Sequence, residues 1–194
     1  MSLPQRRITS VNVAKVRTLS WQGRRVQTGI DKRPVDGLVR GHRLGITDDV
    51  QADLRVHGGP QKAVYVYAAE HYDFWRAELA NVALPPGSFG ENLTTTGLLE
   101  ADVHVGDHLQ IGTAVFEVTQ PRTPCFKLAL KFERFDMIRR FLASCRSGFY
   151  LSVVSEGVLT AGAVVEHARG PVRGPSISDL TRRIAEAKHK RDGS

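Results

Sequence analysis

The residue with the most direct chemical potential is Cys125, which follows two prolines in the segment QPRTPCFKLA. Pro121 and Pro124 fix the backbone just before the thiol, so the side chain is presented in a reproducible direction. Arg122 and Lys127 lie close to it in the sequence, and cations beside a thiol favour the thiolate. A thiolate is either a nucleophile or a soft metal ligand. The residues alone leave an alternative open, namely a buried cysteine that acts as a small hydrophobic side chain.

Two glycine-containing segments could line a ligand pocket, and the first is RVHGGPQKAV. Its adjacent glycines, Gly58 and Gly59, allow the backbone to approach a ligand closely, and Pro60 ends the turn. His57 could donate a hydrogen bond to an anion. A tight turn in front of a buried strand explains the same residues, so both interpretations stay open.

The second segment is GSFGENL, residues 87–93, in a stretch too rich in proline and glycine to form a helix. Glu91 could act as a general acid, and Asn92 could read a base through its amide. An Asx turn explains the pattern equally well.

Composition and spacing exclude several other chemistries. Cys125 and Cys145 are the only cysteines, which excludes a disulfide scaffold and an iron–sulfur cluster held by four thiolates of this chain. Cys145 falls on a predicted helix, where packing explains it. His104 and His108 flank Gly106 in a predicted strand–turn–strand, where such residues stand roughly 13 Å apart, so a metal pair is not expected. Neither G-x-S-x-G nor G-x-G-x-x-G occurs.

The elements that must position these residues are mostly short strands. Runs rich in β-branched residues predict strands, and a helical spacing of Tyr72, Trp75 and Leu79 predicts an amphipathic helix. The aromatic residues of this region are expected in the core. The predicted strands are residues 8–16, 24–30 and 63–67, with further strands within 103–120 and 148–168; the predicted helices are residues 69–79, 127–132 and 135–145.

Residues 83–98 contain two prolines and three glycines, and we expect no regular structure there. Many short strands joined by glycine turns, with a few helices, predict a β-rich fold of the all-β or α+β class. The expected architecture is a distorted β-barrel with attached helices.

The chain of 194 residues and 21.4 kDa suits one domain with a short appendage. A glycine- and proline-containing linker begins at residue 170, and residues 176–194 predict one helix that starts at Ser176 with Asp179 three residues on. We therefore divide the chain into a domain of residues 1–169 and a C-terminal part of residues 170–194.

The net charge of +7 is concentrated in residues 1–50, which hold ten basic and four acidic residues. This distribution fits an anionic small ligand, a nucleic acid or a solvated basic face. No apolar run is long enough to span a bilayer and the first residues lack a signal-peptide pattern, so a cytoplasmic protein without membrane association is expected.

Four motifs together resemble the MOSC domain, a family named for the C-terminal domain of molybdenum-cofactor sulfurases, and in particular its bacterial stand-alone YiiM-like branch. In chain order the motifs are TGIDKRPV, DVQADLRVHGGPQKAVYVYAAEHYDFW, PPGSFGENLTTTGLLEADVHVGDHLQIG and VTQPRTPC. The resemblance covers roughly residues 8–168. It implies a distorted barrel of the pyruvate-kinase-barrel type.

The resemblance implies that the chain binds a molybdenum cofactor, Mo–molybdopterin, with Cys125 as the thiolate ligand of the metal. By motif, Lys32 and Arg122 line the same pocket and act with Cys125 in the reaction. These cations suit a cofactor that carries a phosphate and a dithiolene. Residues of the neighbouring loops are expected to complete the cofactor pocket: His57, Gly58, Gly59, Gly90 and Asn92.

The resemblance also implies reduction of N-hydroxylated small molecules, such as hydroxylaminopurine-type base analogues, with two electrons from an external reductase. One alternative is a non-catalytic module that carries the cofactor, or sulfur as a persulfide on Cys125. Another is a nucleic-acid-binding barrel, which requires exposed aromatic residues among the basic ones and is disfavoured because the aromatics are expected in the core.

YiiM-like proteins carry a C-terminal region of three helices, and residues 176–194 resemble the first of them. We interpret this segment as a truncated remainder of that region. Its helix either packs on the barrel or pairs across a homodimer, because a lone helix of this length frays.

Overall fold

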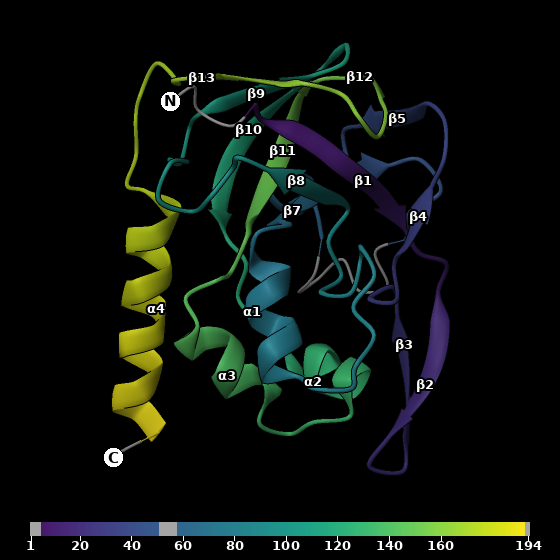
Figure 1. Cartoon of the computed structure of the whole chain (residues 1–194). Helices are drawn as coiled ribbons and strands as arrows, with labels where there is room; N and C mark the ends of the chain where they lie inside the picture. Colours follow the sequence, from purple (N-terminus) through teal and green to yellow (C-terminus); the bar gives the residue numbers. More distant parts are fainter. Residues whose placement is uncertain (1–4, 51–57, 193–194) are drawn as a thin grey trace.

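The computed structural model describes residues 5–50 and 58–192, and one mixed sheet of eight strands dominates it (Figure 1). All its neighbouring strands are antiparallel except β7 and β8, which are parallel. From one edge to the other, the strands are β13 (Val165–Ala168), β9 (His108–Ile111), β10 (Ala114–Pro121), β11 (Phe149–Ser155), β7 (Val64–Ala68), β8 (Leu93–Thr96), β1 (Arg7–Val13) and β4 (Arg33–Val35).

The large sheet curls on itself without closing into a barrel. At the start of β1, the Ile8 amide donates to the Ala163 carbonyl at 2.9 Å, and the Val165 amide donates to the Arg6 carbonyl at 2.9 Å. These bonds bring β1 against the chain that leads into β13. The predicted β-rich fold is therefore confirmed, in the form of a distorted barrel that stays open. Five short strands form two smaller sheets: β12 (Gly157–Leu159), β5 (Val39–His42) and β6 (Gly45–Ile46) form one, and β2 (Arg17–Trp21) and β3 (Arg24–Thr28) form a hairpin.

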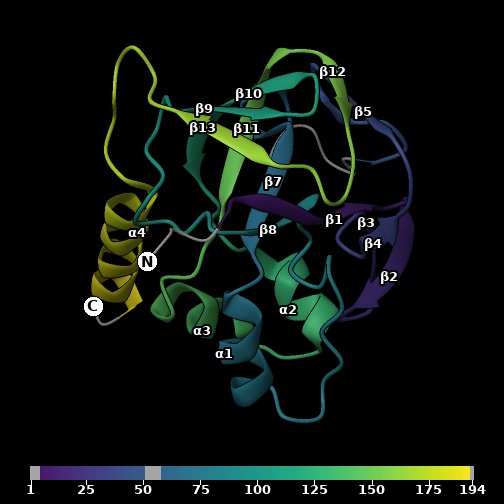
Figure 2. The same ribbon diagram turned by 45° about the horizontal axis from the view of Figure 1, so that its top comes forward.

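The helices lie at one end and along one side of the curled sheet. Three short helices gather below the sheet, and α4 stands beside it (Figures 1 and 2). None of the helices among the described residues is long and apolar enough to cross a lipid bilayer. The helices are α1 (His71–Glu78), α2 (Phe126–Phe132), α3 (Met137–Ala143) and α4 (Ile177–Asp192), and a single 3₁₀ turn, η1, spans Pro60–Lys62.

Two hydrophobic clusters form the core. One fills the inside of the curled sheet, and the other lies between β7 and the helices α1 to α3. In the second cluster Phe89 is fully buried, with its ring centroid 4.8 Å from that of Tyr67 and 5.5 Å from that of Trp75. The aromatic residues of β7 and α1 thus belong to the core, as their spacing predicts, and not to a nucleic-acid surface.

One prediction of local structure is wrong. Residues 93–96 form β8, although residues 83–98 were expected to be irregular. The prolines and most glycines of that stretch end at Gly90, and the run LTTT that follows is rich in β-branched residues. Leu93 pairs with Val66 of β7 and with Val11 of β1, so tertiary pairing makes this short run a central strand. The first strand also ends at Val13, earlier than the predicted residue 16.

We predict that Phe89→Ala lowers the free energy of unfolding by about 3–5 kcal/mol, because it leaves a cavity among closely packed rings. Phe135→Ala removes the same group from a side chain that is 74% exposed and should cost less than about 1 kcal/mol. Urea denaturation of both variants measures the difference. Equal losses of free energy of unfolding in the two variants would show that the packing of the rings around Phe89 does not contribute this part of the stability.

Candidate functional site

Six of the residues expected at the site line one pocket: Lys32, Gly58, Gly90, Asn92, Arg122 and Cys125. The pocket lies where the loops after β3 and before β8 meet the end of β10 and the start of α2. Two expected members are not part of its observed wall. Gly59 precedes η1 and does not line the pocket, and His57 lies outside the described residues.

Lys32 is held by a carboxylate that the sequence analysis did not single out. Its ammonium group forms an ion pair with Asp49, and both side chains are buried, at 8% and 3% exposure. Burial lowers the pKa of Lys32, whereas Asp49 opposes this shift. Asp49 also accepts a hydrogen bond of 2.9 Å from the Ala14 amide, which fixes the carboxylate at the end of β1.

Asn92 connects this ion pair to the sheet. Its side-chain amide donates to Asp49 Oδ2 at 2.8 Å and to the Asn12 carbonyl at 3.3 Å. Its side-chain oxygen accepts a hydrogen bond of 3.1 Å from the Tyr65 amide on β7. With its polar side-chain atoms engaged within the protein, Asn92 positions the wall of the pocket.

Arg122 is the second buried cation. It follows β10, is 6% exposed, and its guanidinium carbon lies 5.2 Å from the Tyr65 ring centroid and 5.0 Å from that of Phe141. Burial alone would lower the pKa of Arg122, but Tyr65, Tyr150 and Cys125 together raise it, so the group stays charged. Its Nη1 atom is buried and has no hydrogen-bond partner within the part of the chain that the structure describes. A buried charged donor without an acceptor is costly and is typical of a ligand site.

Cys125 lies at the edge of the same pocket. It precedes α2 with an extended backbone, and its carbonyl accepts a hydrogen bond of 2.9 Å from the Leu128 amide. The side chain is partly exposed and forms no disulfide. The two prolines before it leave the thiol at the junction between β10 and α2, which is the fixed presentation that the sequence predicts.

The charge of the pocket wall is strongly positive. Besides Lys32 and Arg122, the lysines Lys62 and Lys127 line it, and among its described lining residues the one carboxylate is Asp49, which is paired with Lys32. The enclosed space is about 110 Å³. Pockets that bury most of a ligand enclose roughly 300–1,000 Å³. The described pocket therefore suits one anionic end of a larger ligand.

Tight contacts hold the two loops of the pocket together. Gly87 and Gly90 have φ angles of +87° and +82°, and a Cβ atom at Gly87 would lie 2.6 Å from the Lys32 carbonyl oxygen. The ammonium group of Lys131 on α2 donates to the Gly87 carbonyl at 2.9 Å and to the Ile30 carbonyl at 3.1 Å. Lys131 thus joins the loop that carries Lys32 to the loop that carries Gly90.

Glu91 serves the fold and not the pocket wall. It is fully buried and accepts hydrogen bonds from the amides of Gly87 and Phe89 at 2.7 and 3.0 Å, and from the hydroxyl groups of Tyr72 and Thr94. It is not among the residues that line the pocket. The hypothesis of a general acid at this position is therefore not supported by its contacts.

The site contains residues that the sequence analysis missed, of which Asp49, Tyr65 and Tyr150 matter most. Tyr65 and Tyr150 line the pocket beside Arg122, and their ring centroids are 5.4 Å apart. Burial raises the pKa of both phenols, so they stay neutral. Each of these tyrosines stands in a strand among core residues. Core packing alone explains such a pattern, so the sequence carries no sign that the two line a site. Within the described residues, no group of three or more histidine, cysteine, aspartate or glutamate side chains could hold a metal ion.

Comparisons with known proteins define the family. A family model described as MOSC domain matches residues 53–166. The protein YflK of Bacillus subtilis is 42% identical over 175 residues, which are 90% of this chain and 79% of YflK. The chain therefore belongs to the MOSC domain family, as the four motifs predict.

Further relatives place the chain near YiiM. The Escherichia coli protein YiiM is 39% identical over 142 residues, or 72% of this chain and 63% of YiiM. The crystal structure of YiiM from Geobacillus stearothermophilus superposes with a TM-score of 0.77 at 34% identity, over 94% of this chain and 85% of that one. A protein named reductase, from Gibberella moniliformis, is 33% identical over 167 residues, which are 84% of this chain and 29% of that protein.

We predict that Asp49→Asn lowers the free energy of unfolding by about 3–5 kcal/mol, because it leaves the Lys32 charge buried without its partner. In a Lys32→Met background the same change should cost at least about 1 kcal/mol less. Urea denaturation of the four proteins of this double-mutant cycle measures the coupling. Additive effects would contradict the assignment of Asp49 as the partner of Lys32.

Lys131 makes stability depend on pH. Burial lowers the pKa of Lys131 to about 8, although Glu91 and Asp31 act in the opposite direction. An unfolded lysine titrates near 10.4, so between about pH 8 and 10.4 the unfolded chain binds more protons than the folded chain. The cost of burying this charge is therefore complete below about pH 8, and it disappears as the pH rises to about 10.4.

Subtracting the free energy of unfolding of Lys131→Met from that of the wild type isolates this effect, since all other groups titrate in both proteins. We expect the difference to rise in favour of the wild type by up to about 3 kcal/mol between pH ~7.5 and ~10.5. Urea denaturation across this range measures it. A constant difference would show that Lys131 titrates as an ordinary lysine.

Proposed function

We propose that this chain binds the molybdenum cofactor and reduces N-hydroxylated compounds with electrons from an external reductase. The observation that carries the proposal is the buried guanidinium of Arg122, which lines the pocket together with Cys125 and whose Nη1 has no hydrogen-bond partner among the described residues. Membership of the MOSC family supports the choice of cofactor.

The residues present fit this cofactor chemically. Mo–molybdopterin combines a phosphate with a soft metal centre. The pocket offers one thiol, a buried guanidinium and a buried ammonium group, contributed by Cys125, Arg122 and Lys32. Arginine binds phosphate with two parallel donors, and thiolates favour soft metals. Cys125 would hold the metal, and the cations would hold the anionic part.

When bound, the cofactor supplies two-electron reduction of an N–O bond. The protein's own part is to bind and orient. Arg122 keeps a positive potential at the pocket, which favours anionic ligands over neutral ones, and Lys32 presents a buried ammonium group beside it. The paired Asp49 holds the Lys32 side chain in place. Tyr150 and Tyr65 offer neutral aromatic walls, against which a flat ring such as that of a hydroxylaminopurine packs favourably.

An external electron donor is part of the proposal. The chain has no G-x-G-x-x-G motif and has only two cysteines, too few for an iron–sulfur cluster of its own. The relative named reductase supports the view that the electrons come from outside the domain that it shares with this chain. This chain matches only 29% of that protein's length, which leaves room there for further domains.

A non-catalytic carrier of cofactor or sulfur is the second candidate. The partial exposure of Cys125 favours it, because a persulfide on an accessible thiol can be passed to another protein. Both candidate functions use the same pocket. They differ in that only a reductase turns over an N-hydroxylated substrate.

We predict that the wild type, co-expressed with cofactor biosynthesis, retains molybdenum and pterin at near-stoichiometric content, and that Cys125→Ser loses the metal. Cys145→Ser is the matched control and should retain it, since Cys145 does not line the pocket. Lys32→Ala and Arg122→Ala should weaken retention. Elemental analysis and pterin fluorescence measure the contents.

Reduction of a hydroxylaminopurine by the loaded wild type, with a chemical reductant, tests the activity. Loaded protein without turnover would favour the carrier. Absence of metal from the wild type as well as from Cys125→Ser would overturn the proposed cofactor site.

A further inference from the structure

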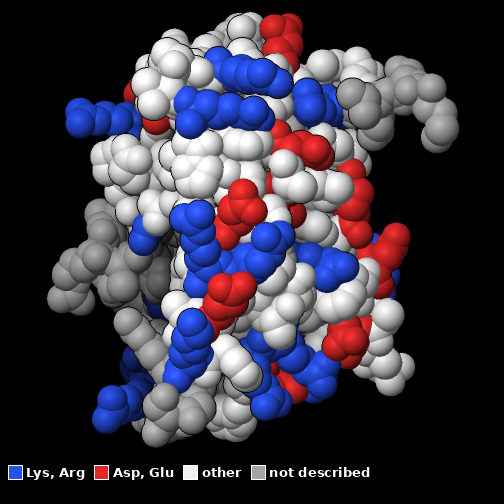
Figure 3. Space-filling model, turned by 90° about the vertical axis from the view of Figure 1, so that its left-hand side faces the viewer, with Lys and Arg blue, Asp and Glu red and all other residues white. Residues whose placement is uncertain are grey.

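A second hollow lies outside the cofactor pocket, between α3 and α4. It encloses about 730 Å³, and α4 forms one of its walls over the second half of the helix. Figure 1 shows α4 standing beside the helices below the sheet, and Figure 3 shows the face that α4 presents to solvent. We call this hollow the α3–α4 groove; its lining includes Phe135, Ile138, Arg139, Leu142, Arg182 and Lys188.

The groove combines an apolar floor with a basic rim. Ile138 and Leu142 form the floor, and Phe135 at its end is 74% exposed. The Phe135 ring also lies 5.0 Å from that of Trp21, and a contiguous apolar surface rimmed by polar residues marks an interaction site. Arg139 and Lys188 lie on opposite walls and have no carboxylate partner among the ion pairs of the described residues. Apolar centres with charged rims are the pattern of protein–protein interfaces.

The rim carries a basic side chain on each wall that has no ion-pair partner among the described residues, Arg139 on α3 and Lys188 on α4. Arg182 of α4 pairs with Asp179 at 3.4 Å, and Glu186 is the one acidic residue among the described lining residues. Figure 3 shows basic side chains spread over this face of the molecule, with fewer acidic ones between them. A partner that is complementary to the groove is therefore acidic.

The groove is connected to the cofactor pocket through α3. Phe141, on the inner side of α3, packs against the Arg122 guanidinium at 5.0 Å, while Ile138 and Leu142 of the same helix face the groove. One helix, about 10 Å across, thus separates the two sites.

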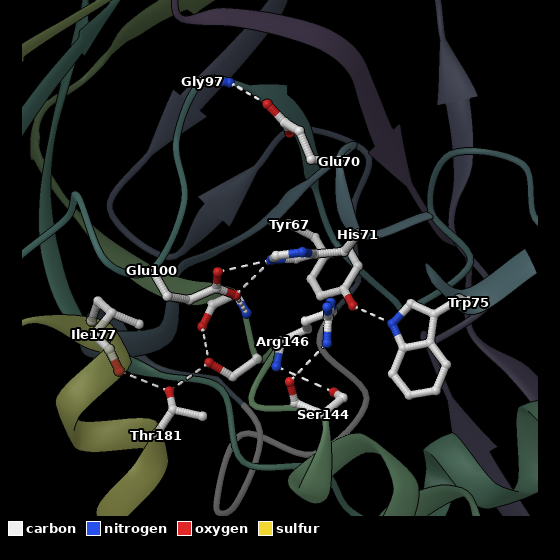
Figure 4. Close-up of polar contacts among 12 residues, drawn as sticks. Tyr67, Glu70, His71, Trp75, Gly97, Glu100, Ser144, Arg146, Ile177 and Thr181 are labelled. Atoms are coloured by element: carbon white, nitrogen blue, oxygen red, sulfur yellow. Dashed lines mark hydrogen bonds and ion pairs between the residues drawn. The ribbon is translucent and has the colours of Figure 1, made fainter. Parts of the chain in front are cut away.

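A second connection runs from α4 to the pocket. Thr181 on α4 hydrogen-bonds Ser147 at 2.8 Å, and the Ser147 carbonyl accepts a hydrogen bond of 2.8 Å from the hydroxyl of Tyr65, which lines the pocket. Figure 4 shows Thr181 and Ile177 of α4 beside Glu100, whose carboxylate accepts the Gly148 amide at 2.7 Å. Ser147, two residues after the groove residue Cys145, is therefore hydrogen-bonded both to α4 and to a residue of the pocket wall.

We infer that the α3–α4 groove is the docking site of an acidic electron-carrier protein, such as a ferredoxin or a flavodoxin, which supplies the reduced state of the cofactor site. This inference rests on the proposed function, because that function requires an electron donor. The basic rim attracts such a carrier, the apolar floor receives its contact surface, and α3 places it one helix away from Arg122.

Two other occupants fit the groove less well. A second copy of this chain would bring a basic rim against a basic rim, which is repulsive. A nucleic acid gains from stacked aromatic residues among the cations, whereas the floor here is mainly aliphatic. Both are measurable outcomes of the test.

The test uses the whole chain, a plant-type [2Fe–2S] ferredoxin and a flavodoxin as probes, at low ionic strength. The groove variant is Arg139→Glu with Lys188→Glu. The matched control is Lys15→Glu with Arg43→Glu, which makes the same change in net charge at exposed positions that do not line the groove. Phe135→Ala probes the apolar end of the groove.

We expect wild type and control to bind one or both carriers with Kd values within about twofold of each other, and the groove variant to bind about tenfold or more weakly. Phe135→Ala should weaken binding by several-fold. Carrier-driven turnover should fall in parallel in the groove variant, while turnover driven by dithionite stays at the wild-type rate.

The two readouts separate the docking site from the proposed function. Missing turnover with dithionite in loaded wild type would overturn the reductase function, and carrier binding would still report on the groove. Docking is overturned if wild type binds neither carrier, if groove and control variants weaken equally, or if single-stranded DNA or a second copy occupies the groove with an affinity that the groove variant abolishes.

Discussion

The structure of the site depends on the burial of two cations, Lys32 and Arg122, of which only Lys32 has a carboxylate partner among the described residues. Asp49 neutralises Lys32, and the sheet holds this carboxylate through Ala14 and Asn92. Arg122 has aromatic rings and a neighbouring thiol around it but no carboxylate, and one of its nitrogens is unpartnered. Burying a charged donor without an acceptor costs free energy unless a ligand offsets it. An anionic ligand beside Cys125 would offset this cost, as the proposed function requires.

The curled sheet and the helices both contribute to the surroundings of the buried Arg122, in different ways. The parallel pairing of β7 and β8 brings Tyr65 of β7 next to Asn92, which immediately precedes β8, and Arg122, directly after β10, lies over the Tyr65 ring. The ring cluster below the sheet supports α3, so that Phe141 closes the other side of the guanidinium. The same packing leaves the outer face of α3 toward α4, where the basic groove forms.

Much of the fold and part of the site could be predicted from the sequence. The motif around Cys125 and the periodicity of α1 carry local signals, and both were interpreted correctly as to structure. Asp49 carries none, because its pairing with Lys32 is made by tertiary contacts between loops. β8 was missed for the same reason, since its neighbours on both sides decide its conformation. A groove between α3 and α4 likewise requires the relative position of two helices that are distant in the chain.

The central claim is that Cys125 binds the metal of an anionic cofactor in this pocket. The most direct measurement is an anomalous difference map at the molybdenum absorption edge, from crystals of protein whose metal content has been established. We predict one strong peak within bonding distance of Cys125 Sγ, with the anionic part of the cofactor against Arg122 or Lys32. A peak elsewhere on the chain, or a metal without contact to Cys125, would contradict the account.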